Sequence, residues 1–329
     1  MSRLLVTGGA GYIGSHTVRA LGKAGHDVVV LDDLSAGRTG SVGECLLAVG
    51  DVGDAAFVDS VFKAHGPFDG VIHFAGFIEV ARSVVDPLAF YETNLTKAAS
   101  LVDRSIEHGV KAFVFSSTAA VYGIPEEQPI PESAPIAPIN PYGSSKAMLE
   151  QVLADVHHAH QLPWIALRYF NACGADPAGD LGEDHDPETH LIPLAIAAAA
   201  GRHPGMTLFG TDYPTPDGTC IRDYIHVNDL ASAHVLAVEG LIGGVSSGAY
   251  NLGTGIGRSN REVLETIGAV VGTPVPYTES DRRAGDPAEL VADSTRFRTE
   301  FGWEPASSDL HDIVRTAWSW HSSNWGSGV

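Results

Sequence analysis

The chain has 329 residues, of which 44% are hydrophobic and 18% are charged. These values are ordinary for a packed globular protein and exclude long disordered or fibrous architectures. Its formal net charge of −20 makes nucleic acid and anionic membranes poor partners, because phosphate groups are repelled at long range. The length accommodates two domains of about 150 residues each. An anionic ligand would require a few arginines gathered around it locally.

The three cysteines, Cys45, Cys173 and Cys220, are widely spaced and form no CxxC pair. We therefore expect neither a disulfide framework nor a structural zinc site, and a reducing compartment fits. The N-terminal apolar run leads directly into glycines, unlike a signal peptide. We expect a soluble, cytoplasmic protein.

The first half of the chain alternates short apolar runs with longer segments of helical period. The runs are mostly continuous, as in strands buried on both faces of a parallel sheet, and cover residues 4–7, 28–31, 71–74, 113–115 and 165–167. The intervening segments are long enough for crossover helices. We predict an α/β fold with a doubly wound, parallel Rossmann-type sheet.

The amino-acid composition changes after about Asn171. Residues 174–187 are rich in glycine, proline and acidic residues, and a second turn-rich loop follows at residues 210–218. We predict a sheet-containing domain over residues 1–171, joined by part of 223–253. A smaller α/β substrate domain over residues 172–329 would be interleaved with it.

Glycines follow the first predicted strand in a pattern that suits a dinucleotide. Gly8 allows a tight turn, Gly11 the close approach of a pyrophosphate, and Gly14 the packing of a helix on the strand. The phosphates would then lie on free N–H groups at the start of the helix predicted over residues 15–21. A glycine pattern alone is common, so the strand before it and the helix after it carry the prediction.

Acidic residues after later strands extend the predicted cofactor site. Asp32 ends the second strand, at the spacing of about 20 residues that a ribose-binding acid takes. A carboxylate there accepts both ribose hydroxyls and repels a 2′-phosphate, which favours NAD over NADP. Asp51 is placed to meet the adenine amino group, although a solvated loop acid is an equally simple interpretation. We predict NAD as the cofactor of the first domain.

Tyr142 and Lys146 are spaced i and i+4, which puts a phenol and an ammonium on one helix face. A free phenol ionises near pH ~10, so a base at neutral pH requires its pKa to fall by about 3, or roughly 4 kcal/mol. Lys146 and an oxidised nicotinamide are the cations able to lower it. Thr118 is placed to share the proton of a substrate hydroxyl. The alternative is an exposed Tyr–Lys pair without a function.

Nine motifs follow one another along the chain: TGGAGYIGSH, HFAG, FSSTAAVYG, PYGSSK, RYFN, PETHLIP, FGTDYPTPDGTCIRDYIHV, YNLGTG and RRAGD. In this order they resemble the UDP-glucose 4-epimerases of the extended short-chain dehydrogenase/reductase family. The resemblance runs from residue 3 to about residue 320. The long segment at residues 209–227 is far more specific than the glycine loop.

This resemblance implies an isomerase of galactose metabolism that holds NAD tightly without consuming it. Ionised Tyr142 would take the proton from the sugar 4-hydroxyl while the C4 hydride moves to NAD. The resulting 4-keto sugar would turn over in the site and regain the hydride on its other face, interconverting UDP-glucose and UDP-galactose. Lys146 would lower the pKa of the phenol and hold the nicotinamide ribose, and Thr118 would hydrogen-bond O4.

The family's binding residues carry over onto matching positions. Asn171, Arg222 and Arg283 would bind the diphosphate. The implied cofactor contacts are Gly8, Gly11, Tyr12, Ile13, Gly14, Asp32, Asp33, Asp51, Val52, Phe74, Ala75, Gly76, Asn94, Ser116, Tyr142, Lys146 and Phe170. The implied substrate contacts are Thr118, Tyr142, Asn171, His190, Leu191, Phe209, Arg222, Tyr224, Arg283, Asp286 and Leu290.

Three positions bear on how far the resemblance extends. Ile78 stands where many relatives carry a lysine beside the cofactor phosphates, which removes one cation from the predicted NAD site. Thr93 stands where an asparagine is often found. Leu290 occupies a position whose bulk is associated with admitting N-acetylated sugars. Its intermediate size leaves UDP-N-acetylhexosamines and UDP-pentoses open as substrates.

The same residues also bear on other functions and partners. Nucleotide-sugar 4,6-dehydratases usually place an acid pair after the threonine, whereas Ala119 and Ala120 follow Thr118. A non-catalytic NAD-binding sensor typically lacks the Tyr–Lys pair or the nucleotide arginines. The histidines at residues 157–160 do not converge on one helix face, so we expect no metal. The resemblance implies a homodimer. The apolar stripes at residues 94–108 and 145–157 could pair with its second subunit or could equally pack on the sheet.

Overall fold

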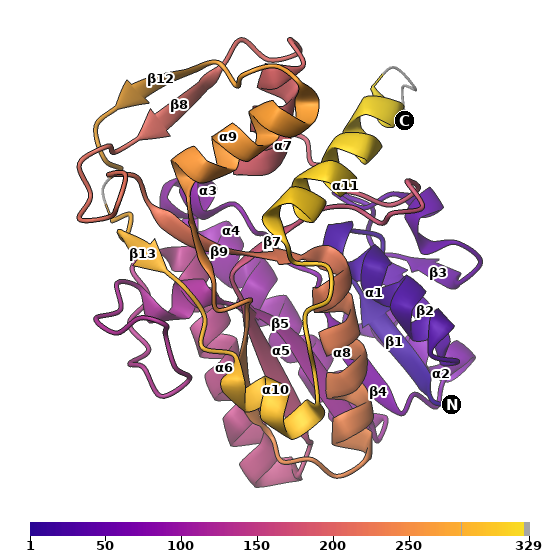
Figure 1. Ribbon diagram of the computed structural model, residues 1–329. Helices are drawn as coiled ribbons and strands as arrows, with labels where there is room; N and C mark the ends of the chain where they lie inside the picture. The colour runs from indigo at the N-terminus through magenta and orange to yellow at the C-terminus, as the bar shows by residue number, and fades with distance from the viewer. Residues whose placement is uncertain (284, 326–329) are drawn as a thin grey trace.

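The computed structural model describes residues 1–283 and 285–325. A seven-stranded parallel sheet with the strand order β10-β6-β5-β4-β1-β2-β3 runs through its lower part (Figure 1). The strands are β1 (Arg3–Thr7), β2 (Asp27–Asp32), β3 (Leu46–Val49), β4 (Gly70–His73), β5 (Ala112–Thr118), β6 (Trp164–Tyr169) and β10 (Gly248–Leu252). Helices cover both faces, so the predicted doubly wound α/β fold is confirmed.

Side chains on each strand alternate between two hydrophobic cores. On β1, Leu4 and Val6 face helices α1 (Tyr12–Lys23) and α8 (Val227–Ile242), whereas Leu5 points to the opposite side of the sheet. The helices on that side are α2 (Ala55–His65), α5 (Ala98–Glu107) and α6 (Pro141–His160). Because both faces are buried, the central strands are apolar at nearly every position, which is why residues 4–7, 28–31, 71–74, 113–115 and 165–167 were predictable.

Two strands of this sheet were not predicted. β3 lies at one edge and keeps much of its surface exposed, and β10 forms the other edge with the polar Asn251 buried within it. Asn251 is satisfied inside the protein, since its amide donates to the carbonyl oxygen of Ile130 and accepts from the Tyr122 hydroxyl. Edge strands and buried polar groups of this kind weaken the apolar signal from which strands are predicted.

Short helices connect the first part of the sheet: η1 (Thr39–Val42), α3 (Val80–Val85), α4 (Pro87–Tyr91), the π-helical η2 (Glu92–Lys97) and η3 (Ala119–Tyr122). A smaller group of elements lies above the carboxyl ends of the sheet strands (Figure 1). It comprises β7 (Asn171–Cys173), α7 (Leu191–Ala199), β8 (Met206–Phe209), β9 (Ile221–His226), β11 (Gly257–Ser259), α9 (Asn260–Val271), β12 (Tyr277–Ser280), β13 (Glu289–Leu290) and α11 (Leu310–Asn324). α10 (Thr295–Phe301) instead packs beside β10.

The smaller group has its own core and small sheets. Strands β7, β9, β11 and β13 form one sheet and β8 pairs with β12 in another, while α7, α9 and α11 bury their apolar faces against one another. The chain reaches this group after β6 and returns to the large sheet through α8 and β10. We propose the two domains on this basis, with residues 227–252 belonging to the first.

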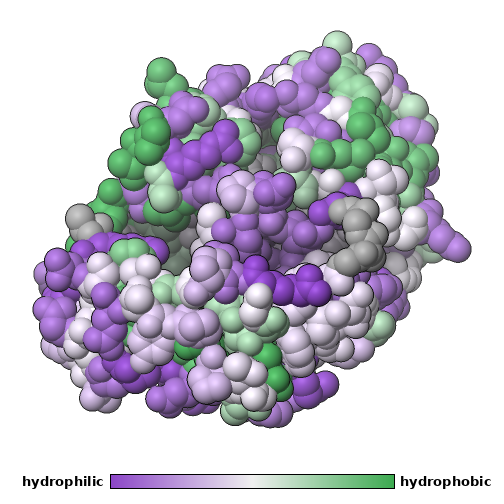
Figure 2. Space-filling model, turned by 90° about the horizontal axis from the view of Figure 1, so that it is seen from above, coloured by the Kyte–Doolittle hydropathy of each residue, from purple (hydrophilic) through white to green (hydrophobic). Residues whose placement is uncertain are grey.

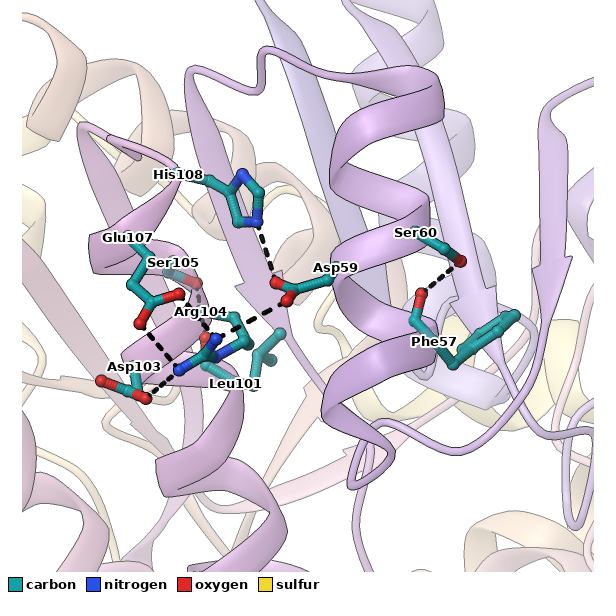
Figure 3. A network of polar contacts seen from close by, with 9 residues as sticks. All are labelled: Phe57, Asp59, Ser60, Leu101, Asp103, Arg104, Ser105, Glu107 and His108. Atoms are coloured by element: carbon teal, nitrogen blue, oxygen red, sulfur yellow. Dashed lines mark hydrogen bonds and ion pairs between the residues drawn. The ribbon is translucent and has the colours of Figure 1, made fainter.

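Charged residues tie neighbouring helices together on one outer face of the large sheet. Asp59 on α2 accepts from Nε2 of His108 at 2.9 Å, and the Arg104 guanidinium on α5 lies 3.6 Å from the same carboxylate (Figure 3). Such exposed pairs add little stability individually, so α2 and α5 are held mainly by the apolar core beneath them. None of the helices formed by residues 1–283 and 285–325 combines the length and apolar character needed to cross a bilayer.

A buried carboxylate joins α8 to the segment that precedes α11. Asp229, only 4% exposed, accepts hydrogen bonds from the backbone N–H groups of Ala306 and Ser307 and from the Ser308 hydroxyl. Asp229→Asn would turn an NH₂ group toward these donors, so we expect a loss of about 1–3 kcal/mol in the free energy of unfolding. Urea denaturation measures it.

The matched control is Asp309→Asn at the exposed N-cap of α11, where asparagine caps as well as aspartate and the free energy should change little. Equal losses in the two variants would show that burial of Asp229 is not the cause.

Candidate active site

The glycine loop joins β1 to α1. β1 lies between β2 and β4, at the point where the strand order of the sheet reverses, and ligands of doubly wound sheets bind at this point. Gly8 has φ = +70°, and a Cβ added there would lie 2.5 Å from the backbone nitrogen of Ala75. A Cβ on Gly14 would lie 2.1 Å from the Gly8 carbonyl oxygen. Both glycines are therefore required by the packing of the chain itself.

Gly11 differs from these two glycines. A Cβ on Gly11 would meet only the Gly8 carbonyl oxygen, at an ordinary distance of 3.4 Å. Gly11 is also the N-cap of α1 and offers no side-chain cap, so the N–H groups of the first turn are left for another acceptor. This arrangement fits the pyrophosphate of a dinucleotide, for which close approach of the backbone matters.

The Asp32 carboxylate lies at the end of β2 against the glycine loop. Its two oxygens accept from the backbone N–H groups of Ala10 and Leu34, each at 2.9 Å, and the side chain is nearly buried. Burial raises the pKa of Asp32, and these two hydrogen bonds oppose the rise. Each oxygen keeps a free lone pair, so the residue fits the ribose hydroxyls that the sequence predicts.

The remaining acidic residues near the predicted adenosine site have partners in the chain. Asp33 is exposed and caps a turn by accepting from the N–H and hydroxyl of Ser35. Asp51 accepts from Gly53 N–H at 2.7 Å and from Lys97 Nζ at 2.6 Å, while its neighbour Val52 is buried. Despite burial, Lys97 and Gly53 lower the pKa of Asp51. Their contacts with adenosine stay predictions.

Asn94 holds the loop that follows β4. It lies in the π-helical turn η2, accepts from Phe77 N–H at 2.8 Å and donates to the Phe77 carbonyl at 2.9 Å and to Ser145 Oγ at 3.3 Å. A Cβ on Gly76 would lie 2.8 Å from its amide oxygen. The observed role of Asn94 is thus to shape the HFAG loop, and the predicted direct contact with NAD is untested. Ile78 is partly exposed beside this loop.

Tyr142 and Lys146 are brought to the carboxyl end of β5. The side chain of Asn140 caps α6 by accepting from Gly143 N–H, and Tyr142 lies in the first turn that follows. Lys146 Nζ donates to the Ser116 carbonyl oxygen at 3.0 Å and lies 4.9 Å from the Phe115 ring centre and 5.9 Å from that of Tyr142. Both side chains are buried.

Burial acts in opposite directions on the charges of these two residues. It raises the pKa of Tyr142 above 10, while a hydrogen bond with Thr118 acts to lower it. It lowers the pKa of Lys146 to about 8, and the nearby carboxylate of Glu150 opposes that shift. The surrounding side chains therefore favour a neutral phenol, so they do not supply the low pKa that a base needs.

The wall beside the pair is formed by β6 and the residues after it. Ser116 hydrogen-bonds the Tyr169 hydroxyl, and Tyr169 in turn lies edge-on to His234 of α8, whose ring also contacts Phe74. Burial raises the pKa of Tyr169, so it stays a neutral hydrogen-bonding group. Phe170 packs instead toward Tyr122 and Val121.

A buried charged network near the pair was not predicted. Arg168 binds the Glu150 carboxylate through Nε at 3.0 Å and through its terminal nitrogen at 2.5 Å, and it also donates to the Tyr122 hydroxyl. Ser117 donates to the same carboxylate. The i+4 spacing of Lys146 and Glu150 and the arginine of the RYFN motif were the available signals. The network fixes α6, and with it Tyr142 and Lys146, against β5 and β6.

The predicted nucleotide residues gather in the smaller group of elements. Arg222 on β9 pairs with Asp286, and the guanidinium of Arg283 lies 4.0 Å from the centre of the Phe209 ring. Asn171 on β7 donates to the Asp223 carbonyl at 3.0 Å. Seen from above, hydrophilic side chains spread over the middle of the molecule, with hydrophobic patches toward its margins (Figure 2).

Other predicted substrate residues differ in accessibility. Tyr224 is 6% exposed and belongs to the core of the smaller group, with its hydroxyl 3.4 Å from Asn260. Leu290 on β13 is partly exposed and packs against the small cluster of Val121, Tyr122 and Ile130. His190 precedes α7, pairs with Glu183 and lies next to Leu191, the first residue of that helix. Burial lowers the pKa of His190, but Glu183 and Glu188 outweigh it and raise the value overall.

Comparisons with known proteins agree with this geometry. The family profile described as "NAD dependent epimerase/dehydratase family" matches residues 4–253. The chain is 52% identical to a UDP-glucose 4-epimerase of Azospirillum brasilense, over 98% of this chain and 92% of that one. It is 47% identical to the UDP-glucose 4-epimerase of Brucella ovis, solved in complex with NAD, with a TM-score of 0.94 and coverage of 97% and 98%. The enzyme of Bifidobacterium longum, solved with NAD+ and UDP, is 39% identical, with a TM-score of 0.92 and coverage of 98% and 99%.

The glycine geometry leads to a contrast between variants. Gly11→Ala should fold but retain less NAD through purification, because its methyl group meets only the Gly8 carbonyl oxygen and enters the space predicted for the phosphates. In the NAD-free protein its melting temperature should fall only slightly, by the cost of alanine at an N-cap. Gly14→Ala should also lose NAD, and its NAD-free melting temperature should fall much further, because its Cβ meets backbone. The bound NAD is released by heat denaturation of the protein and quantified by chromatography.

Gly22→Ala on the open side of α1 serves as the control. It should keep its NAD and should not lower the melting temperature, since nothing lies within 4 Å of its added Cβ and alanine suits a helix better than glycine. Full NAD retention by Gly11→Ala would contradict the proposed position of the pyrophosphate.

Proposed function

The chain belongs to the NAD-dependent epimerase/dehydratase family, and we propose that it is an isomerase that interconverts UDP-glucose and UDP-galactose at C4 with bound NAD. The observation that carries this proposal is the buried Tyr142–Lys146 pair at the carboxyl end of β5, next to the HFAG loop that packs on Gly8. When bound, NAD supplies the chemistry of accepting and returning a hydride. The protein must then handle a proton and let the sugar turn.

Tyr142 is the group we propose to remove and return the proton of the sugar 4-hydroxyl. Its neighbour Thr118 is 9% exposed and its hydroxyl already accepts from Ala120 N–H at 3.1 Å, so the hydroxyl is oriented before substrate arrives. Lys146 is kept at the site by Ser116 and acts as the positive charge on this side of the phenol. The positive charge of an oxidised nicotinamide complements it in lowering the pKa of the phenol.

We place the diphosphate of the substrate on the arginines of the smaller group. Arg222 lies on β9, and Arg283 lies over the Phe209 ring of β8. A diphosphate needs such local cations because the chain as a whole has a net charge of −20. Asp286 pairs with Arg222, so it orients the guanidinium and leaves other N–H groups for the phosphates. Strong binding of the nucleotide and few contacts with the hexose allow the ketosugar to turn over.

The structure also bears on the alternative functions. Elimination of water in a dehydratase requires an acid and a base beside the threonine, but Ala119 and Ala120 begin the η3 turn there. A sensor without catalysis does not need a buried lysine beside a buried tyrosine, whose burial costs free energy. Leu290, which packs against the cluster of Val121, Tyr122 and Ile130, does not decide between a hexose, an N-acetylhexosamine and a pentose substrate.

Tyr142→Phe tests the assignment of the base. The variant should still bind UDP-sugar but should lose about 10²–10⁴-fold in turnover, because it cannot move the proton. The assay incubates protein with UDP-galactose without added NAD and analyses the sugars. Formation of UDP-glucose without net NADH would support the epimerase. A 4-keto-6-deoxy sugar would instead indicate a dehydratase, and the absence of any product would indicate a sensor.

Tyr277→Phe is the control for the loss of a tyrosine hydroxyl, since its hydroxyl accepts from Arg261 at 2.9 Å on the exposed strand β12. Turnover by Tyr142→Phe within tenfold of the parent would rule out Tyr142 as the base.

We further propose a cytoplasmic homodimer built on α3, α4 and α6. Val84, Val85 and Leu88 are 64%, 85% and 78% exposed, and Met148 on α6 is also exposed. α3 and α4 pack against α6, so these side chains belong to one face of the molecule. An apolar face of this kind suits a second copy better than water.

Replacing Val85 and Leu88 together by glutamate should therefore give a monomer in light scattering, because the charges would be desolvated in the interface. Ile242→Glu, at the exposed end of α8, should leave the mass of the assembly unchanged. A parent protein that is already monomeric would overturn the proposed dimer.

A further inference from the structure

Four side chains of the segment between β7 and α7 converge at one point. They are Glu183, His185, Glu188 and His190, and their ligand atoms all lie within 4.8 Å of one another. We propose that these residues bind a divalent transition-metal ion of the zinc class. The inference is independent of the epimerase reaction and departs from the expectation of no metal, which considered only the histidines at residues 157–160.

The distances fit a tetrahedral ion better than a set of hydrogen bonds. His185 Nδ1 lies 3.4 Å from Glu183 Oε1 and 3.8 Å from Glu188 Oε2, and His190 Nδ1 lies 3.7 Å from Glu188 Oε1. Ligands bound at about 2.0–2.1 Å around tetrahedral zinc are separated by about 3.4 Å. The Glu183–His190 contact is closer than these three, so a small relaxation of that pair opens the site.

The donor types and their charges select the class of ion. Two imidazole nitrogens and two carboxylate oxygens form a mixed set that suits zinc and its first-row neighbours, whereas calcium and magnesium prefer oxygen alone. The two carboxylates together neutralise the charge of a divalent ion. Glu183 is 4% exposed, so its negative charge is withdrawn from water and requires a positive partner.

One donor atom in the cluster has only long contacts. His185 Nδ1 is buried and makes no hydrogen bond of ordinary geometry among the described residues, although Glu183 lies within ion-pair distance of it. It is directed toward the two carboxylates, as its distances from them show. A metal ion would satisfy this nitrogen, and a proton on each histidine is the competing occupant.

The position of the cluster gives it a structural consequence. The His185 ring lies edge-on to the Tyr12 ring in the first turn of α1, and Tyr12 donates its hydroxyl to the Gly174 carbonyl at 2.7 Å. The neighbouring Asp184 pairs with Arg38, close to the glycine loop. A metal at residues 183–190 would therefore fasten this segment over the predicted cofactor site. His190 would then be a metal ligand rather than the predicted nucleotide contact.

The test uses the full chain with its bound NAD, treated with a chelator and returned to metal-free buffer. Zinc added in excess and removed by gel filtration should leave about one equivalent per chain in elemental analysis, and zinc should raise the melting temperature. Cobalt should give the visible absorption bands of a four-coordinate ion. Less than about one-fifth of an equivalent of zinc would overturn the proposal and assign the cluster to ion pairs.

Two variants locate the ion, and a matched one serves as the control. His185→Ala and Glu188→Gln should each lose the zinc-dependent melting shift and the cobalt bands, while circular dichroism verifies that they fold. The double variant His158→Ala and His160→Ala removes exposed histidines of α6 and should bind zinc like the parent. Unchanged zinc binding by both His185→Ala and Glu188→Gln would overturn the site. Every readout is separate from turnover, so failure of the epimerase proposal would not affect it.

Discussion

The buried ammonium of Lys146 is the group on which the geometry of the catalytic pair depends. It lies between the Phe115 ring and the Ser116 carbonyl oxygen, where a cation loses its hydration and must be compensated. The carbonyl at the end of β5 supplies one compensation, and the charge of Glu150 one turn along α6 supplies another. With a pKa of about 8, Lys146 stays mainly charged at neutral pH. The Glu150–Arg168 pair thus serves both the fold of α6 and the charge at the site.

Burial acts against the charge that Tyr142 needs, because the charged phenolate is the form we propose as the base. The chain favours the neutral phenol. In the proposed mechanism, proton removal at neutral pH therefore depends on the positive charge of the oxidised cofactor, with Lys146 as the nearby cation. Such an arrangement links the protonation of the Tyr142 phenol to the oxidation state of the bound cofactor. It suits a reaction in which the same proton and hydride are taken and given back.

Close backbone packing explains why the cofactor site is built where it is. Gly8 and Gly14 let β1, α1 and the loop after β4 approach each other more closely than any other residue allows, and Asn94 holds that loop from a π-helical turn. Segments from the second half of the chain then close over it, through the Tyr12–Gly174 hydrogen bond and the Arg38–Asp184 pair. Ile78 supplies no positive charge to the predicted NAD site, where many relatives carry a lysine. The two contacts from the second half of the chain close the site instead.

The sequence alone determined the parallel sheet, the glycine loop, the acid at the end of β2 and the Tyr142–Lys146 spacing. Each of these is local, because strand burial, helix period and turn geometry act within a few residues. Only the tertiary structure decided that Arg222 pairs with Asp286, 64 residues away, that Asn94 binds the HFAG loop, and that edge strand β10 joins the first sheet. It also brought two glutamates and two histidines of an irregular segment to one point. No periodicity marks such an arrangement, because the contacts between loops depend on how the surrounding elements pack.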